Sequence, residues 1–422
     1  MIGTGVFTSL GYQLDVIRSP FVLLSLWVVG GVIALCGAMS YAELGAAFPR
    51  SGGEYNFLSR IYHPAAGFVS GWVAALIGFA APIALVTILF GTYFVSILPG
   101  VETDSWAVKV LAIGLVVIMT IVHSTNHQNS GATQTIFTSL KVAFIILFCG
   151  FALVFAPEQQ AISLLPATGD GNLMLGSAFA ISLIYVSYAY TGWNAATYLT
   201  GEVFEPRRNI PKILFTGTFV VMVAYVALNY MFLKVAPMGA MAGKLEIGII
   251  VAEYAFGPTG AKFIGIALAF LLISTVSAMV IAGPRVLQTL GEDFPVFRIF
   301  AKTNTDDIPV NSIRFQTLLT IGFILTSSFE QILVFSGALL ALNSFFTVLG
   351  LLVLRWKQPG LVRPFRVPFF PLTPLVYLTL TGFTLTFVAI SRPLEALGAL
   401  LIVSTGLVVY FITRNMGKTK IS

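Results

Sequence analysis

Charged residues are scarce in this sequence. Only 9% of its 422 residues are charged and 57% are hydrophobic, whereas a soluble domain carries about 25% charged residues. Its two cysteines, Cys36 and Cys149, both lie inside apolar stretches, as buried small hydrophobic residues do. The composition excludes an ordinary soluble domain, and the net charge of +6 gives no reason to expect nucleic acid binding.

Motifs of catalysis and metal binding are also missing. The chain has no GxxxxGK[ST] sequence to cradle nucleotide phosphates. His123 and His127 flank a short polar loop, but no third ligand of suitable spacing follows them. The apolar stretches hold no convergent nucleophile, base or metal cluster. We therefore expect no enzyme, no metal site and no cofactor.

Long apolar runs recur along the whole chain. Most of them can cross a hydrocarbon core of about 30 Å, which takes about 20 helical residues, so the sequence predicts a polytopic helical membrane protein surrounded by lipid. We read the short segment Ile247–Phe256, which contains Glu253, as an external loop helix packed on the bundle. The twelve predicted runs span residues 1–13, 19–48, 64–98, 106–122, 131–156, 174–203, 210–236, 259–290, 312–329, 331–354, 370–390 and 394–413.

Basic residues gather in alternate connections between these runs. The richer set comprises Arg50, Arg60, Arg207, Arg208, Lys212, Arg298, Lys302, Arg314, Arg355, Lys357, Arg363 and Arg366, followed by the C-terminal tail. The poorer set comprises Arg18, Lys109, Lys234, Lys244, Lys262 and Arg392. Because cytoplasmic connections carry the excess of basic residues, we expect both termini in the cytoplasm.

Glycine interrupts two runs at corresponding places. The first run contains Gly3-Thr4-Gly5, and the sixth, SLIYVSYAYTGWNAATYL, contains Gly192. These runs open two halves of five runs each, residues 1–156 and 174–356, which precede a final pair at 370–413. Paired glycine-broken helices are typical of transporters built from inverted repeats. Close helix packing at small residues is the alternative.

Five sequence blocks resemble, in order, the amino acid permeases of the amino acid–polyamine–organocation (APC) superfamily. They read GTGVF, SYAELGAAFPRSGGEY, YTGWNAATYLTGEVFEPRRNIP, AGPRVLQTLGEDFPVF and RWKQPGLVRPFRVP. The GWN and RRNIP pieces are most similar to the L-type amino acid transporters and their bacterial relatives. The resemblance implies an all-α membrane protein with a twelve-span, five-plus-five inverted-repeat fold like that of leucine transporters.

The activity implied by the resemblance is secondary active transport of amino acids by alternating access. Runs 1, 2, 6 and 7 would rock against a scaffold of runs 3, 4, 8 and 9, in a bacterial inner membrane. In the family the first helix has a cytoplasmic half before its break. Here Met1 stands in mid-helix, so we expect a fragment that lacks this half; a shorter protein without part of its inner gate is the alternative.

The broken first run is the expected site for the substrate's charged groups. An amino acid is a zwitterion, and its burial requires partners for both charges. Half-helix N-termini offer free N–H groups and a positive dipole end to a carboxylate. The resemblance assigns this role to Thr4 and Gly5, with Gly3 supplying the turn. Carbonyls near Ile2 and Tyr188 would hold the ammonium group.

Side chains of the sixth and tenth runs are expected around the rest of the substrate. By the resemblance, Tyr188 takes the place of an aromatic gate, with packing as the alternative. Gly192 forms the break, and Trp193 and Asn194 follow it. Asn343 can approach the side-chain pocket or form a hydrogen bond between helices.

Lys141 lies within the fifth run, GATQTIFTSLKVAFIILF. A lysine inside a span is costly and marks function by default; snorkelling to the interface is the alternative. Sodium-coupled relatives of this fold hold a cation between helices one, five and eight, and proton-coupled and exchanging relatives place a lysine there. Lys141 falls at that position, which implies a sodium-independent transporter.

Three modes of action remain open for such a protein. A buried lysine can lose its proton near neutral pH, so we expect proton-coupled symport. A sodium-independent exchanger is the alternative, and a transporter-like amino acid sensor is a third hypothesis.

Charged residues near the predicted cytoplasmic ends are candidates for gating ion pairs. They are Glu43, Arg50 and Glu54 after the second run, and Glu202, Glu205, Arg207 and Arg208 after the sixth. Solvated loop charges are an equal alternative, because an exposed pair contributes at most about 1 kcal/mol.

The predicted loop between the third and fourth spans bears on partners. Eukaryotic L-type transporters are joined to a heavy chain through a cysteine in this loop, which here reads PGVETDSW and has no cysteine. We predict no disulfide-linked partner, so the protein should run as a single chain on non-reducing gels. A heavier species that collapses on reduction and contains a second polypeptide would contradict this; the oligomeric state is left open.

Overall fold

The computed structural model describes residues 2–3, 5–96, 98, 106–125 and 130–418, without the side chains of residues 130–134, 202 and 415–418. Met1, Thr4, His127 and most of the loop at 99–106 lie outside the described residues, as does the side chain of Glu202. The expectations placed on these groups therefore stay predictions.

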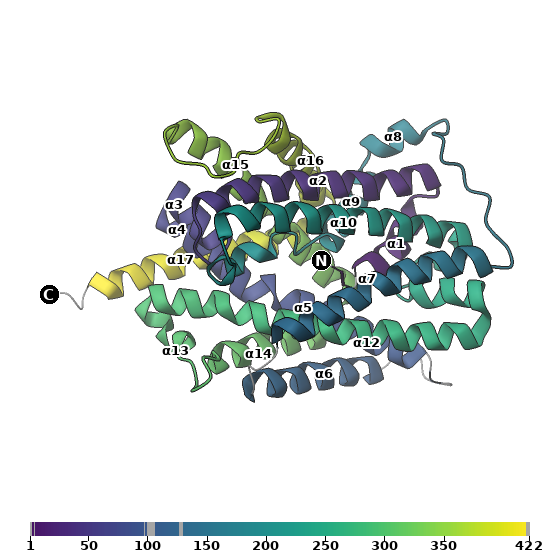
Figure 1. Ribbon diagram of the computed structural model, residues 1–422, viewed down its shortest axis with the longest axis horizontal. Coiled ribbons are helices and arrows are strands. Elements are labelled where there is room, and N and C mark those ends of the chain that lie inside the picture. Colours follow the sequence, from purple (N-terminus) through teal and green to yellow (C-terminus); the bar gives the residue numbers. More distant parts are fainter. Residues whose placement is uncertain (1, 4, 97, 99–105, 126–129, 419–422) are drawn as a thin grey trace.

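Regular structure in this described part of the chain is helical throughout (Figure 1). The first half contains α1 (Gly5–Val16), α2 (Pro20–Ala47), α3 (Glu54–Ile61), α4 (Pro64–Val73), the π-helical turn η1 (Ala74–Gly78), α5 (Ala80–Ser96), α6 (Trp106–Thr125) and α7 (Ser130–Phe155). The second half contains α8 (Asp170–Leu175), α9 (Ser177–Ala189), the 3-10 helix η2 (Ala195–Glu202), α10 (Pro206–Val235), α11 (Met238–Met241), α12 (Ile247–Asp293), η3 (Pro295–Phe297), α13 (Arg298–Ala301), α14 (Val310–Thr326) and α15 (Phe329–Lys357). The chain ends with α16 (Leu372–Ser391) and α17 (Pro393–Lys418).

Nine helical segments within the described ranges are long and apolar enough to cross a membrane. They are α2, α4 to α5, α6, α7, α10, α12, α15, α16 and α17. The three other predicted runs contain the shorter helices α1, α9 and α14. The prediction of an all-helical membrane protein is confirmed.

The long helices run roughly along one axis, which gives the bundle two distinct ends (Figure 1). We call the end that holds α3, α13 and the last turns of α17 the basic end (Figure 1). Arg50 stands between α2 and α3, Arg298 begins α13, and Arg355 pairs with Glu43 near the end of α2. The start of α12 and the helix α8 lie at the opposite end.

Two local features differ from the predicted runs. The segment Ile247–Phe256 forms the first part of α12, separated from the rest by the non-helical Gly257 (φ 71°, ψ −179°). Its residues Ile247, Val251 and Ala252 are fully buried, so its packing on the bundle is as predicted. The short helix α3 was missed, because its eight residues lie in the polar stretch after the second run.

Candidate functional site

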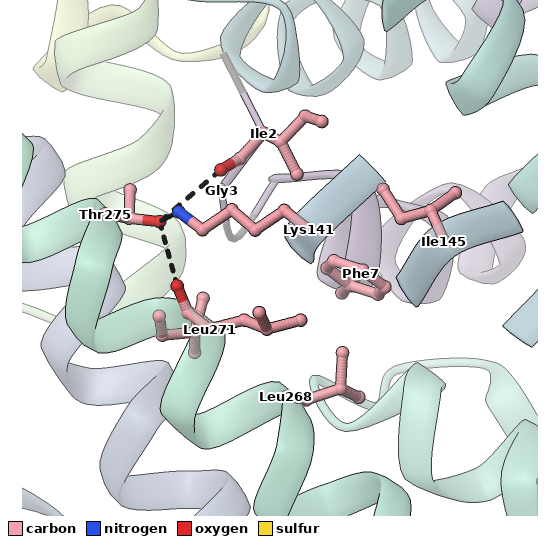
Figure 2. A pocket seen from close by; sticks show the side chains of 9 residues that line it. Ile2, Gly3, Phe7, Lys141, Ile145, Leu268, Leu271 and Thr275 are labelled. Atoms are coloured by element: carbon pink, nitrogen blue, oxygen red, sulfur yellow. Dashed lines mark hydrogen bonds between the residues drawn. The ribbon is translucent and has the colours of Figure 1, made fainter. Parts of the chain in front are cut away.

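Lys141 of α7 reaches into a pocket between α1, α7 and α12 (Figure 2). Its side chain is buried, with 6% exposed, and its Nζ donates a hydrogen bond of 2.6 Å to the hydroxyl of Thr275 on α12. The remaining walls are largely apolar and include Phe7, Ile145 and Leu268. The charge thus points inward, which argues against the snorkelling alternative.

Thr275 joins the lysine to the start of the chain. Its Oγ1 lies 3.4 Å from the carbonyl oxygen of Ile2 and 3.5 Å from that of Leu271, one turn earlier in α12. Both distances are long for a hydroxyl donor, so the Lys141 bond is the tightest of the three. Lys141 therefore reaches the first broken span through a hydroxyl group, and the backbone of Gly3 lines the same pocket (Figure 2).

The two broken spans lie side by side, and their backbones come into close contact at Gly5 and Ala189. A Cβ on Gly5 would lie 2.5 Å from the Cα of Ala189, which is the last residue of α9. One turn away from this contact in each helix, the Ser9 hydroxyl of α1 donates to the carbonyl of Tyr185 in α9, at 3.2 Å. The structure thus gives Gly5 a packing role, and the carboxylate role expected of Gly5 stays a prediction.

Tyr225 of α10 bridges the same two spans. Its fully buried hydroxyl donates to the carbonyl of Ala189 at 3.2 Å and also faces the backbone of Gly3. The ring packs on Tyr190, with centroids 5.0 Å apart. One side chain therefore contacts both breaks, a role that the sequence pattern did not indicate.

The sixth span breaks at Gly192, which has a φ of 90°. Glycine adopts such a conformation readily, whereas other residues pay for it. Before the break, Tyr188 is 4% exposed. Its carbonyl already accepts from the backbone N–H and the hydroxyl of Thr191, at 2.9 and 2.7 Å. A substrate ammonium group at this carbonyl would share it with Thr191.

The residues after the break face α2 and α3. Trp193 packs edge-on against Tyr41 of α2, with ring centroids 4.7 Å apart. The side-chain amide of Asn194 donates a bond of 2.6 Å to the carboxylate of Glu54. Asn343, the predicted pocket residue of α15, is half-buried. The structure therefore joins Asn194 to a buried carboxylate and does not bring it to the Lys141 pocket.

At the basic end, Arg50 pairs with Asp293 in the last turn of α12. The closest nitrogen and oxygen are 3.1 Å apart, and both side chains are partly exposed. The Tyr55 hydroxyl also donates to Asp293. Burial, helped by this hydrogen bond, raises the pKa of Tyr55, so the hydroxyl keeps its proton. This cluster ties the α2–α3 connection to α12.

Glu43 forms a separate, buried cluster. Its carboxylate binds Arg355 at 2.5 Å and lies 3.2 Å from Nε of Arg363, while the backbone N–H of Val367 donates to it at 2.7 Å. The Arg355 guanidinium also lies over the Phe370 ring, 3.8 Å from its centroid. Glu43 is 1% exposed, so it anchors the α15–α16 connection to α2.

The charges after the sixth run behave differently. Arg207 is exposed, and Arg208 forms a loose, exposed pair with Glu205 at 3.9 Å. Such a pair adds little stability. Of the gate candidates with described side chains, Arg50 and Glu43 form ion pairs with partners distant in sequence, whereas Arg208 and Glu205 pair with each other.

At the opposite end, a polar cluster forms where α15 begins and α16 ends. Glu330 of α15 pairs with Arg392 at 2.5 Å and accepts a bond of 3.0 Å from the Tyr185 hydroxyl of α9. Tyr12 of α1 packs on Tyr185, with ring centroids 5.4 Å apart. Side-chain contacts thus join α1 and α9 to α15 at this end.

Four residues of these clusters were missed from sequence: Thr275, Tyr225, Asp293 and Glu330. Thr275 and Tyr225 stand in apolar runs with other hydroxyl-bearing residues, and no pattern distinguishes them. Asp293 could have been found, because it is a charged residue within the block AGPRVLQTLGEDFPVF, at the predicted cytoplasmic face.

Comparison with known proteins supplies the class of the protein. The family model for amino acid permeases matches residues 1–413. The chain belongs to this family, so it is a multi-pass membrane transporter of amino acids and not an enzyme.

Three relatives match 98% of the chain at 24–27% identity. The chain is 27% identical to mouse large neutral amino acids transporter small subunit 2 over 98% of its own length and 78% of that protein. It is 27% identical to mouse Asc-type amino acid transporter 1, with the same coverage. It is 24% identical to mouse b(0,+)-type amino acid transporter 1, over 98% and 84% of the two chains.

Close packing of α1 on α9 generates a stability prediction. Gly5→Ala places a methyl group against the Ala189 backbone, so the helices must separate. We expect a loss of about 1–3 kcal/mol, as for other overpacked sites, seen as a lower melting temperature in detergent. The control is Gly150→Ala in α7, where a Cβ meets open space. A Gly5→Ala protein as stable as the control would contradict the packing role.

Proposed function

We propose that this protein carries an amino acid across the membrane by alternating access, without sodium, and that Lys141 takes the place of a coupling cation. The observation that carries the proposal is the inward-pointing Lys141 Nζ, 2.6 Å from Thr275, in a pocket that also includes Ile2 and Gly3. The ammonium group links α7, α12 and the first broken span.

Electrostatics explains why a sodium ion is excluded in this proposal. Two positive charges in contact repel by several kcal/mol, at an effective dielectric constant of about 20. The Thr275 hydroxyl and the Ile2 carbonyl are both oxygen ligands of the kind sodium requires. The hydroxyl already accepts a hydrogen bond from Lys141 and lies 3.4 Å from the carbonyl oxygen. The positive charge of Lys141 and the engagement of these two oxygens therefore both disfavour sodium binding.

Contacts at both ends of the bundle support alternating access. The Arg50–Asp293 cluster lies at the basic end, and the Tyr185–Glu330–Arg392 cluster lies at the opposite end. In this proposal each cluster opens in turn while the other stays closed. Substrate binds between them, at the breaks of α1 and of the sixth span.

The proposal also includes the orientation of the transporter and the membrane in which it lies. The gathering of arginines at one end supports a cytoplasmic basic end. A bacterial inner membrane rests on the resemblance of the GWN and RRNIP pieces, since the relatives named above are mammalian. One of them is named a small subunit; the absence of a disulfide-linked partner for this chain stays a prediction.

Sodium replacement is the first functional test. In proteoliposomes, uptake of labelled neutral amino acids should be the same in sodium chloride and in choline chloride, because the ammonium group of Lys141 occupies the cation's place. A clear sodium requirement in the unsubstituted protein would contradict the role given to Lys141, but not amino acid transport itself.

The pH profile tests proton coupling. Symport requires protons to move inward with substrate, so uptake should rise as external pH falls, and Lys141→Ala should remove this dependence. Lys212→Ala, which changes an exposed lysine of α10, is the matched control and should keep this dependence.

A flat pH profile with strong stimulation of uptake by internal amino acid would identify an exchanger. Substrate binding without counterflow of labelled amino acid would identify a sensor.

A further inference from the structure

Glu54 is a buried carboxylate whose hydrogen-bond donors in the described part of the chain are neutral. It is 2% exposed and stands at the first residue of α3. Its Oε1 accepts bonds from the Tyr41 hydroxyl at 2.9 Å and from the Asn194 amide at 2.6 Å, and the Tyr198 hydroxyl faces the same carboxylate. Within the described residues, the ion pairs do not include Glu54. A buried charge without a cation needs such donors.

Asn194 holds the chain directly after the break of the sixth span. It lies two residues beyond Gly192, whose φ is 90°. Its own carbonyl accepts from the backbone N–H and the hydroxyl of Thr197, at 2.9 and 2.7 Å, which starts η2. The short amide–carboxylate bond to Glu54 is charge-assisted, and such bonds are about twice as strong as neutral ones. Glu54 therefore restrains the point at which the span changes direction.

The α2–α3 connection is also bonded to η2 along its length. Gly52 and Gly53 donate backbone bonds of 3.3 and 3.2 Å to the carbonyls of Tyr198 and Thr197. The Ser51 hydroxyl accepts from the N–H of Gly201 at 2.9 Å. Gly53 is needed for this approach, because a Cβ there would lie 2.8 Å from the Tyr198 ring. The connection and η2 form one unit.

This unit ends in the Arg50–Asp293 pair. Arg50 precedes the bonded residues by one position in the chain and reaches α12 at the surface of the basic end. Glu54 follows them and reaches the break in the protein interior. The Arg50–Asp293 contact at the basic end and the Glu54–Asn194 bond at the break thus lie at the two ends of the same bonded segment.

We propose that Glu54 is a positioning residue for substrate binding: it acts through Asn194 to hold the broken sixth span, and it joins that break to the Arg50–Asp293 contact. It contributes to substrate affinity without touching the substrate. The inference rests on the proposed function, because it assumes that the amino acid binds at the breaks.

Replacement by glutamine tests the proposal, because it removes the charge that strengthens the hydrogen bonds to Glu54. The carboxamide oxygen can still accept from Tyr41 and Asn194, as Oε1 does now, but as a neutral acceptor. Glu54→Gln should therefore loosen Asn194 and raise the KM of amino acid uptake about tenfold or more, the loss expected for a hydrogen bond to a charged group.

The sharpest version of the test exchanges the two partners. Asn194→Asp alone places two carboxylates against each other and should raise KM by a similar factor. In the double variant Glu54→Gln/Asn194→Asp, the new amide can donate to the new carboxylate, so the bond re-forms with reversed polarity. We expect the KM of the double variant to return to within about threefold of the original, a non-additivity typical of residues in contact.

A second pair of variants keeps the test decisive if Glu54→Gln fails to fold. Tyr41→Phe removes one donor and preserves the charge, and should raise KM about threefold to tenfold, as for the loss of one hydrogen bond. Tyr62→Phe removes a hydroxyl bond from the other end of α3 to Phe346 and should leave KM unchanged. Melting temperatures measured in parallel show which variants are folded.

The outcomes separate this inference from the proposed function. If the unsubstituted protein moves no amino acid, the proposed function fails, and the inference fails with it. If that protein transports and folded Glu54→Gln or Tyr41→Phe keeps its KM, the inference alone is wrong. It is also wrong if the double variant binds substrate no better than the single variants.

Discussion

A lysine ammonium group inside a membrane bundle must find its hydrogen-bond partners in the protein, because lipid offers none. Lys141 meets this constraint through the hydroxyl of Thr275, which in turn approaches the carbonyl of Ile2. The arrangement requires α12 and the first broken span to stay close to α7. The pocket between these three elements therefore depends on one positive charge.

The two helix breaks depend on the close contact between the backbones of α1 and α9. Gly5 lets α1 approach the Cα of Ala189, and Tyr225 contacts the backbone of both spans from α10. Free backbone groups at such breaks can serve a zwitterionic substrate only if the protein holds them in place. Packing at Gly5 and binding at the breaks are therefore compatible roles. Glu54 restrains the second break from the side of α3.

The helical membrane fold could be predicted from the sequence because apolar runs of span length have few alternatives in a bilayer. Lys141 could be singled out for the same reason, since one charge in such a run is conspicuous. The partners of Glu43 and Arg50 could not, because they lie far along the chain, at Arg355 and Asp293. Long-range pairing depends on packing that sequence spacing does not reveal.

Equilibrium binding to the purified protein tests the central claim most directly, because it separates the effect of an ion on the site from its effect on turnover. A labelled neutral amino acid is titrated in choline chloride and again in sodium chloride at equal ionic strength. If the Lys141 ammonium group occupies the cation's place, the two Kd values agree. A Kd about tenfold lower in sodium, equivalent to about 1.4 kcal/mol of coupling, would show that sodium binds beside Lys141 and would contradict the account.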